Sequence, residues 1–185
     1  ITLKQASNDT TGGNHDFWEI GAGESHDVFQ AEGPGVITHI WFTIAAQSQY
    51  HLKEIVMRAW WDGQEKPSIE VPIGDFFGLN LGEYEHYQSA YLACSPGKSL
   101  NSYFAMPYRK SARIEVTNEG KRPIPAFYSN IDYCRVPALP NDALYFHAQY
   151  RQATPCDPVP ESEGHLNIDG QRNYVFMESH GRGHL

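Results

Sequence analysis

Carboxylates beside aromatic rings and glycines are the residues of this chain best suited to chemistry. The stretch Gly74–Gly78 reads GDFFG and places Asp75 next to Phe76 and Phe77. Glycines permit close approach of a backbone, and aromatic rings beside an acid suit a ligand with polar edges and an apolar face, such as a sugar. Alternatively, Asp75 caps a single helical turn and both rings belong to the core. The residues alone leave both interpretations open.

Hydrolysis of a glycosidic bond needs two carboxyl groups, about 5–5.5 Å apart for retention of configuration or roughly 6.5–9.5 Å for inversion. The carboxylates nearest to aromatic residues and glycines are Asp16, Asp75 and Glu178. No spacing rule sets any two of them at those distances. The sequence therefore assigns no catalytic residue within the chain.

Other kinds of site find little support. His180 and His184 are four residues apart, but Gly181 and Gly183 argue against the helix that would place both on one face. Cys156 has no base specified nearby, and the chain lacks a nucleophile elbow and a glycine-rich nucleotide loop. We therefore predict neither a metal nor a cofactor.

Composition narrows the class of protein further. A chain of 185 residues fits one domain, and a net charge of -8 argues against nucleic acid or an anionic membrane as the main partner. No apolar run approaches the roughly 18 residues of a membrane span. Cys94, Cys134 and Cys156 lack the spacing of a disulfide framework or a zinc site, although one disulfide remains open.

Short segments separated by Gly and Pro turns predict about nine or ten strands and no helix longer than two turns. Residues 36–46 form the clearest buried strand, apolar on both faces, with His39 and Trp41 sharing one face. Residues 112–117 alternate, and 126–136 are expected to pair with them in antiparallel fashion. Residues 1–24 are expected to be a loop that can include a short extended segment. The strands are expected at residues 26–31, 36–46, 52–61, 68–73, 89–94, 100–107, 112–117, 126–136, 144–151 and 173–178. This pattern predicts an all-β, antiparallel β-sandwich of jelly-roll type.

The order of several motifs resembles glycoside hydrolase family 172, long catalogued as a domain of unknown function. These motifs are DTTGGNHDFW, GPGVITHIWFT, PSIEVPIGDFFG, YFAMPY, ARIEVTNEG, LYFHAQYR and a final GRGH turn. The resemblance extends from about Asn8 to His184. It implies a core of two jelly rolls, assembly as a homo-oligomer (trimer or hexamer), and an active site near a protomer interface. It also implies retaining hydrolysis of fructo- or arabinofuranosides by a pair of glutamates.

In one respect the chain departs from the family pattern. The family's catalytic glutamates follow the GRGH turn, in motifs that would lie beyond Leu185. The resemblance therefore implies that residues 1–185 are a single jelly roll, the first of two, and that the catalytic pair lies on a second, C-terminal jelly-roll segment. The positions that match the family, and that we expect to bind the carbohydrate substrate, are Asn14, Asp16, Trp41, Asp75, Phe76, Phe77 and, more loosely, His147 and Tyr150.

Two other functions stay open at this point. The chain could be a carbohydrate-binding module without catalysis, or a structural jelly roll that assembles into a larger particle. We expect a bacterial protein in a periplasmic or extracellular location rather than a cytoplasmic one.

Overall fold

The computed structural model describes residues 1–156, 160, 162, 164, 169–170 and 173–185. The chain divides into two compact units, Ile1–Gln149 and Tyr150–Leu185, and each is described by itself. All three cysteines, which fall within the described residues, are free.

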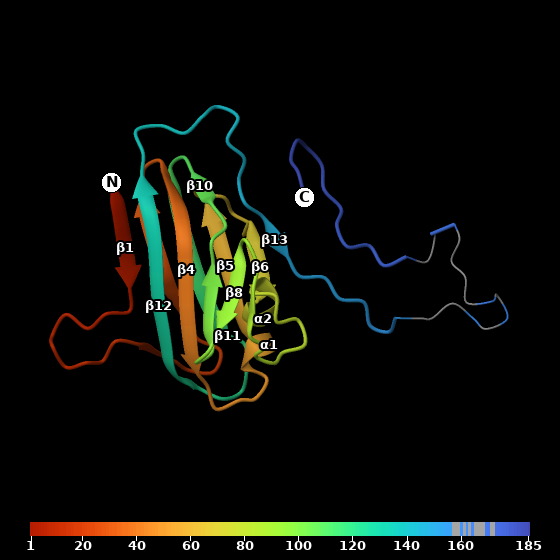
Figure 1. Cartoon of the computed structure of the whole chain (residues 1–185), viewed down its shortest axis with the longest axis horizontal. Coiled ribbons are helices and arrows are strands. Elements are labelled where there is room, and N and C mark those ends of the chain that lie inside the picture. The colour runs from red at the N-terminus through yellow and green to blue at the C-terminus, as the bar shows by residue number, and fades with distance from the viewer. Residues whose placement is uncertain (157–159, 161, 163, 165–168, 171–172) are drawn as a thin grey trace. The chain divides into compact units, whose positions relative to one another are not determined.

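The first unit is a sandwich of two β-sheets (Figure 1). One sheet has eight strands: β1 (Thr2–Ala6), β2 (Trp18–Ile20), β4 (Gly35–Ala45), β7 (Tyr87–Gln88), β8 (Leu92–Ser95), β9 (Ser99–Ser102), β10 (Met106–Tyr108) and β12 (Ile124–Arg135). The other has five: β3 (Ser25–Glu32), β5 (Ile55–Trp61), β6 (Ile69–Pro72), β11 (Ser111–Asn118) and β13 (Ala148–Gln149). The predicted all-β, jelly-roll type of antiparallel sandwich is confirmed.

Strand order places the two longest strands of the eight-stranded sheet, β4 and β12, next to each other. The eight-stranded sheet runs β1-β12-β4-β9-β8-β7, with β2 added to β12 and β10 added to β4. The five-stranded sheet runs β13-β6-β5-β11-β3. Every pair is antiparallel except β13 with β6, which is parallel. Figure 1 shows β1, β12 and β4 side by side along the eight-stranded sheet.

Alternation along the strands explains the core. On β11, Ala112, Ile114 and Val116 are buried, as their period of two predicts. On the opposing sheet, Phe42 and Phe127 have no exposed surface, and their ring centroids lie 5.0 Å apart. Burial of a side chain of this size stabilises the fold by about 1.5–3 kcal/mol.

The prediction that residues 36–46 are buried on both faces is wrong. The buried residues of β4, such as Ile40 and Phe42, alternate with His39, Trp41 and Thr43, which are only half-buried. The second face of β4 therefore lies toward the outside of the sandwich, where it takes part in the site described below.

The predicted pairing of β11 with the segment 126–136 is also wrong. The strand β12 pairs with β4, β1 and β2, whereas β11 pairs with β3 and β5. Residues 119–123 carry the chain from one sheet to the other. In a sandwich the buried faces of β11 and β12 both point into the space between the sheets, so alternation is the same for a hairpin and for this crossover.

Predicted strand 144–151 is reduced to the two residues of β13. The carbonyl oxygen of Phe146 accepts a hydrogen bond of 2.7 Å from the indole of Trp61, and the hydroxyl of Tyr145 donates to Asp62. The carbonyl oxygen of Phe146 is thus bound to a side chain and not to a neighbouring strand. The predicted strand at 173–178 is wrong, because these residues of the second unit form no strand.

Four further boundaries differ from the predictions. The segment 52–61 begins with a helical turn, α1 (His51–Glu54), before β5, and a second turn, α2 (Ile73–Phe76), follows β6. The segment 100–107 is interrupted between β9 and β10. Residues 1–24, expected as a loop with a short extended segment, contain two strands, β1 and β2, which pair with β12. Both helices are four residues long, and within the described residues no helix could cross a membrane.

Candidate functional site

Polar and aromatic side chains gather on the outer face of the eight-stranded sheet, over β4, β9 and β12. We call this set the sheet-face cluster; it consists of His39, Trp41, Ser99, Asn101, Tyr103 and Asp132. The strands bring it together by register, because His39 pairs with Asp132 and Trp41 pairs with Asn101. Side chains of directly opposed residues lie on the same face of a sheet.

His39 is held between two oxygen acceptors. Its Nδ1 lies 3.2 Å from Oδ2 of Asp132, and its Nε2 lies 3.2 Å from Oδ1 of Asn101. A neutral imidazole donates from one nitrogen only, whereas the imidazolium form donates to both neighbours. Asp132 also accepts from Lys4, at 3.2 Å, so the carboxylate is shared between two basic groups.

Ser99 fixes the orientation of two further members of the cluster. Its Oγ accepts hydrogen bonds from Nε1 of Trp41 at 2.7 Å and from Nδ2 of Asn101 at 3.0 Å. With its amide nitrogen directed at Ser99, Asn101 presents its oxygen to His39. The side chains are thus held before any ligand arrives, which lowers the entropic cost of binding.

Tyr103 provides the exposed part of the cluster. Its ring stacks on the imidazole of His39, with centroids 4.7 Å apart and planes 8° apart, and half of the residue is exposed. An exposed ring beside an indole and a fixed amide suits a ligand with one apolar face and several hydroxyl groups.

The N-terminal loop that contains Asn14 and Asp16 is folded around a second carboxylate. Asp9 accepts hydrogen bonds from the hydroxyl and amide of Thr11, at 2.6 and 2.8 Å, and from the amide of His15 at 3.1 Å. Chiefly through the Thr11 hydroxyl, these bonds lower the pKa of Asp9 to about 2. Asp16 accepts from the amide of Asp9 at 2.6 Å, and Asn14 is exposed with a φ of 57°.

This loop reaches the same outer face as Trp41. The ring of Phe17 contacts the ring of Tyr128 on β12, with centroids 5.5 Å apart. Tyr128 is paired with Thr43, two residues from Trp41 along β4. The structure therefore places the loop of Asn14 and Asp16 beside the face that carries Trp41.

Asp75 occupies a different position, between the two short helices. Both of its carboxylate oxygens accept from Nζ of Lys53, at 2.7 and 2.8 Å. The N-cap residue of α2 is Pro72, and no side chain caps this helix. The alternative in which Asp75 caps a helical turn is therefore wrong: the carboxylate joins α2 to α1 by an ion pair.

Phe76 and Phe77 lie in the core, as the interpretation of both rings as core residues predicted. Phe77 has no exposed surface and contacts Phe42 edge-on, whereas Phe76 contacts Phe146. From Phe146 the ring contacts continue through Phe104 to Tyr91, which is 57% exposed. Phe76 is thus the inner end of a series of ring contacts that reaches the surface at Tyr91. That Phe76 and Phe77 contact a substrate stays a prediction.

The remaining two predicted site residues lie outside the sheet-face cluster. His147 is exposed and immediately precedes β13. Tyr150 belongs to the second unit, where its hydroxyl contacts Oε1 of Gln152 at 3.3 Å. Their expected roles in substrate binding stay predictions.

A cavity of about 490 Å³ beside α1 was not predicted from the sequence; among its lining residues are Ser48, His51, Glu83, Tyr84 and Lys98. The carbonyl oxygen of Ser48 accepts from Nδ1 of His51 at 2.8 Å, so Nε2 of His51 accepts from the hydroxyl of Tyr84 at 3.0 Å. Burial lowers the pKa of His51, and burial raises the pKa of Tyr84. Both groups are therefore neutral near pH 7.

The sequence also failed to indicate Asn101, Tyr103 and Asp132 as members of a site. The one available signal was that His39 and Trp41 share a face of β4. The partners of His39 lie 62 and 93 residues further along the chain, and only the strand order shows that they meet. Among the described residues, no group of three or more His, Cys, Asp or Glu side chains could hold a metal ion.

Comparisons with solved structures and with curated proteins gave no close relative. Two crystal structures, of the serine protease of Aeromonas sobria with the chaperone ORF2 and of the serine protease of Aeromonas sobria, match with 11% and 12% identity and TM-scores of 0.33 and 0.32. They cover 74% and 72% of this chain, and the chain spans 27% of each of them. Likenesses at this level carry no argument about fold or activity. The search of curated proteins returned no match.

The model of one protein family, described as GH172 domain-like, matches residues 13–129. The matched region contains Asn14, Trp41, Asn101, Tyr103 and Asp75. Because this match covers more than half of the chain, the chain belongs to glycoside hydrolase family 172.

Proposed function

We propose that this chain is the first jelly roll of a furanoside-acting glycoside hydrolase, in which it positions the substrate. The observation that carries the proposal is the family match over residues 13–129, which includes Asn14 and Asp16 of the N-terminal loop and most of the sheet-face cluster. Fructo- and arabinofuranosides are the proposed substrates. The stacked Tyr103 and the fixed amide of Asn101 offer the mixture of apolar and polar contacts that a furanose ring requires.

In this proposal the catalytic carboxylates come from a second jelly-roll segment. The acids nearest to the candidate positions already have strong partners: Asp75 binds Lys53, Asp132 binds Lys4 and His39, and Asp16 accepts from a backbone amide. Carboxylates that are held in this way suit structural or positioning roles better than attack on a sugar. These contacts support the proposal that Asp16, Asp75 and Asp132 are not catalytic.

The proposed reaction is a double displacement with retention of configuration. One glutamate of the second segment attacks the anomeric carbon and displaces the leaving group, which the other glutamate protonates. The glutamate that protonated the leaving group then acts as a base and removes a proton from the water that hydrolyses the glycosyl-enzyme. The side chains of this chain hold the sugar in place, and contacts that tighten in the transition state raise the rate.

The proposed assembly is a trimer or hexamer with the active site close to a protomer boundary. The exposed rings of Tyr91 and Tyr103 lie on neighbouring ends of β8 and β9, where the amide of Tyr103 donates to the carbonyl of Tyr91. Aromatic side chains of this kind are enriched where protein surfaces meet. We also propose a periplasmic or extracellular location.

An assay of the complete protein tests the proposal. Turnover of p-nitrophenyl α- and β-linked fructofuranosides and arabinofuranosides is measured, with the corresponding pyranosides as controls. We expect release of p-nitrophenol from at least one furanoside and none from the pyranosides. Binding of furanosides without turnover would contradict the hydrolase and favour the carbohydrate-binding module, and neither binding nor turnover would contradict both.

A further inference from the structure

A groove of about 520 Å³ lies on the outer face of the five-stranded sheet, away from the sheet-face cluster on the other sheet. It runs over β11 between the end of β3 and the turn that joins β5 to β6. The side chains that line it include Gln30, Glu32, Trp60, Gln64, Glu65 and Arg113. Its volume lies within the range of about 300–1,000 Å³ that is typical of small-molecule sites.

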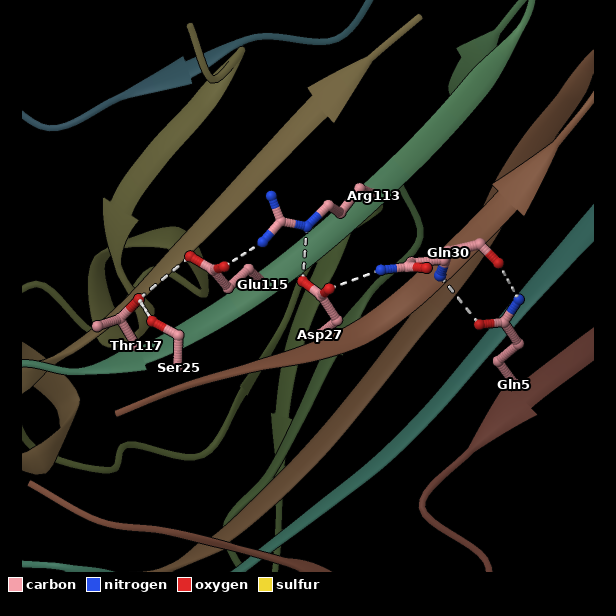
Figure 2. Close-up of polar contacts among 7 residues, drawn as sticks. All are labelled: Gln5, Ser25, Asp27, Gln30, Arg113, Glu115 and Thr117. Carbon is pink, nitrogen blue, oxygen red and sulfur yellow. Dashed lines mark hydrogen bonds and ion pairs between the residues drawn. The ribbon is translucent and has the colours of Figure 1, made fainter. Parts of the chain in front are cut away.

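A network of hydrogen bonds holds two of the polar side chains that line this groove, Gln30 and Arg113 (Figure 2). Nε of Arg113 donates to Asp27 at 2.7 Å, and its Nη2 donates to Glu115. Nε2 of Gln30 donates to the other oxygen of Asp27 at 2.6 Å, and the backbone of Gln30 exchanges two hydrogen bonds with Gln5. Figure 2 shows the guanidinium and the amide on opposite sides of Asp27.

The guanidinium of Arg113 lies over the indole ring of Trp60, with 4.6 Å from its central carbon to the ring centroid. Within the described part of the chain its Nη1 has no hydrogen-bond partner, and Figure 2 shows this nitrogen directed away from Asp27 and Glu115. The groove therefore offers a fixed donor and an aromatic ring next to each other. A preorganised pair of this kind binds a ligand with little loss of side-chain entropy.

The opposite wall of the groove is fixed by Asp62. One oxygen of its carboxylate accepts from the amides of residues 109–111 at 2.7 to 3.2 Å, and the other accepts from the hydroxyl of Tyr145. Burial opposes ionisation of Asp62, but these hydrogen bonds outweigh it and lower its pKa. Asp62 begins a tight turn, in which its φ is 58°. The hydrogen bonds of its carboxylate hold this turn in place, and the next residues of the turn, 63–65, line the groove.

The charges around the groove select the class of ligand. Asp27 and Glu115 bind the guanidinium of Arg113, and Glu32 and Glu65 are further acidic residues among those that line the groove. Acidic groups thus outnumber the one basic group of the lining, so an anionic ligand would be repelled. Amide, carboxylate and guanidinium groups beside an indole ring are suited to the hydroxyls and the apolar face of a sugar. We propose that this groove is a second carbohydrate-binding site, specific for uncharged oligosaccharides and separate from the furanosidase site.

The test uses the complete protein labelled with 5-fluorotryptophan, which gives separate fluorine NMR signals for Trp60 and Trp41. The two signals are assigned with Trp60→Phe and Trp41→Phe. Neutral arabino-, fructo- and gluco-oligosaccharides are titrated, with galacturonate oligomers as the anionic counterpart. We expect at least one neutral oligosaccharide to shift the Trp60 signal in a saturable manner, and the galacturonates to leave it unchanged.

A matched pair of variants localises the binding. Glu65→Trp fills the groove at an exposed position, whereas Lys66→Trp adds the same side chain at the next exposed residue, which does not line the groove. We expect Glu65→Trp to weaken the binding that shifts Trp60 by about tenfold or more, and Lys66→Trp to change it by less than about twofold. Thermal unfolding of both variants checks that they fold like the parent.

Several outcomes would overturn the proposal. They are a shift of the Trp41 signal alone, no shift with any neutral oligosaccharide, a larger response to the galacturonates, or equal effects of the two variants. A change of oligomeric state in Glu65→Trp, without saccharide binding in the parent, would show that the groove is a protein interface instead. Because the readout is binding at Trp60, its result is independent of whether the protein hydrolyses furanosides.

Discussion

Lys53 donates to both carboxylate oxygens of Asp75, at 2.7 and 2.8 Å, and so joins α1 to α2. The carboxylate is largely buried, with 15% of its side chain exposed, whereas the lysine is 34% exposed. The acid of the GDFFG stretch is therefore part of the scaffold beside the cavity at α1. We therefore expect loss of the Asp75 carboxylate to affect the stability of the fold more than the binding of a ligand.

Asp75→Ala is expected to lower the free energy of unfolding by about 1–2 kcal/mol, between the values for exposed and for buried ion pairs. The reason is that Lys53 loses its bidentate partner. Chemical denaturation of Asp75→Ala, Lys53→Met and the double variant measures the effect. The double variant should lose less than the sum of the single losses; strictly additive losses, or no loss in Asp75→Ala, would contradict the role of the pair.

Gly74→Ala is expected to destabilise the fold by about 1–3 kcal/mol, because a new methyl group overpacks a tight contact. A Cβ at this position would lie 2.8 Å from Cβ of Leu52 and 2.9 Å from its carbonyl oxygen. The close approach that the glycine permits is thus between α1 and α2. Gly183→Ala is the control, since a Cβ there meets nothing within 4 Å. Equal unfolding midpoints for the two variants would contradict this packing.

His51 makes the fold sensitive to mild acid. Burial is the main cause that lowers its pKa below the usual value of about 6.5. The folded state therefore binds its proton less readily than the unfolded state, so the stabilisation is complete above about pH 6.5 and is lost as the pH falls below it. Relative to His51→Gln, the parent should lose unfolding free energy between about pH 7.5 and pH 5.5. A pH-independent difference between the two would contradict the assignment.

Tyr103→Ala is expected to reduce kcat/KM on a furanoside by about tenfold, because the exposed ring stacked on His39 is removed. Half of the residue is exposed, so the unfolding free energy should change by less than about 1 kcal/mol. Tyr103→Phe should retain most of the activity. Tyr50→Ala removes another exposed tyrosine, 62% exposed, and should leave kcat/KM unchanged. Equal losses in Tyr103→Ala and Tyr50→Ala would contradict a specific role for Tyr103.

The type of fold could be predicted from the sequence because alternation is a local property. Ala112, Ile114 and Val116 show which face of β11 is buried, and the same reasoning applies to Phe127 and Ile131 on β12. Alternation specifies a face and not a neighbour. It could not show that β11 and β12 belong to different sheets, since both buried faces point into the same core.

The site could be predicted only in part, because its contacts join distant residues. Trp41 was predicted as a site residue from the sequence. Asn101 and Asp132 lie on the same face of the sheet as Trp41 only because β9 and β12 are the neighbours of β4. The ion pair of Asp75 joins residues 22 positions apart, with a β-hairpin between them. The role of Asp62 could not be predicted for the same reason, because its partners Arg109 and Tyr145 lie 47 and 83 residues further along the chain.

The most direct test of the central proposal is the configuration of the first product released by the complete protein. Proton NMR during the first turnovers of an accepted furanoside reports the anomer before it equilibrates in solution. We predict that the released sugar has the same anomeric configuration as the substrate, as a double displacement by two glutamates requires. Release of the opposite anomer, or no hydrolysis of any fructo- or arabinofuranoside, would contradict the account.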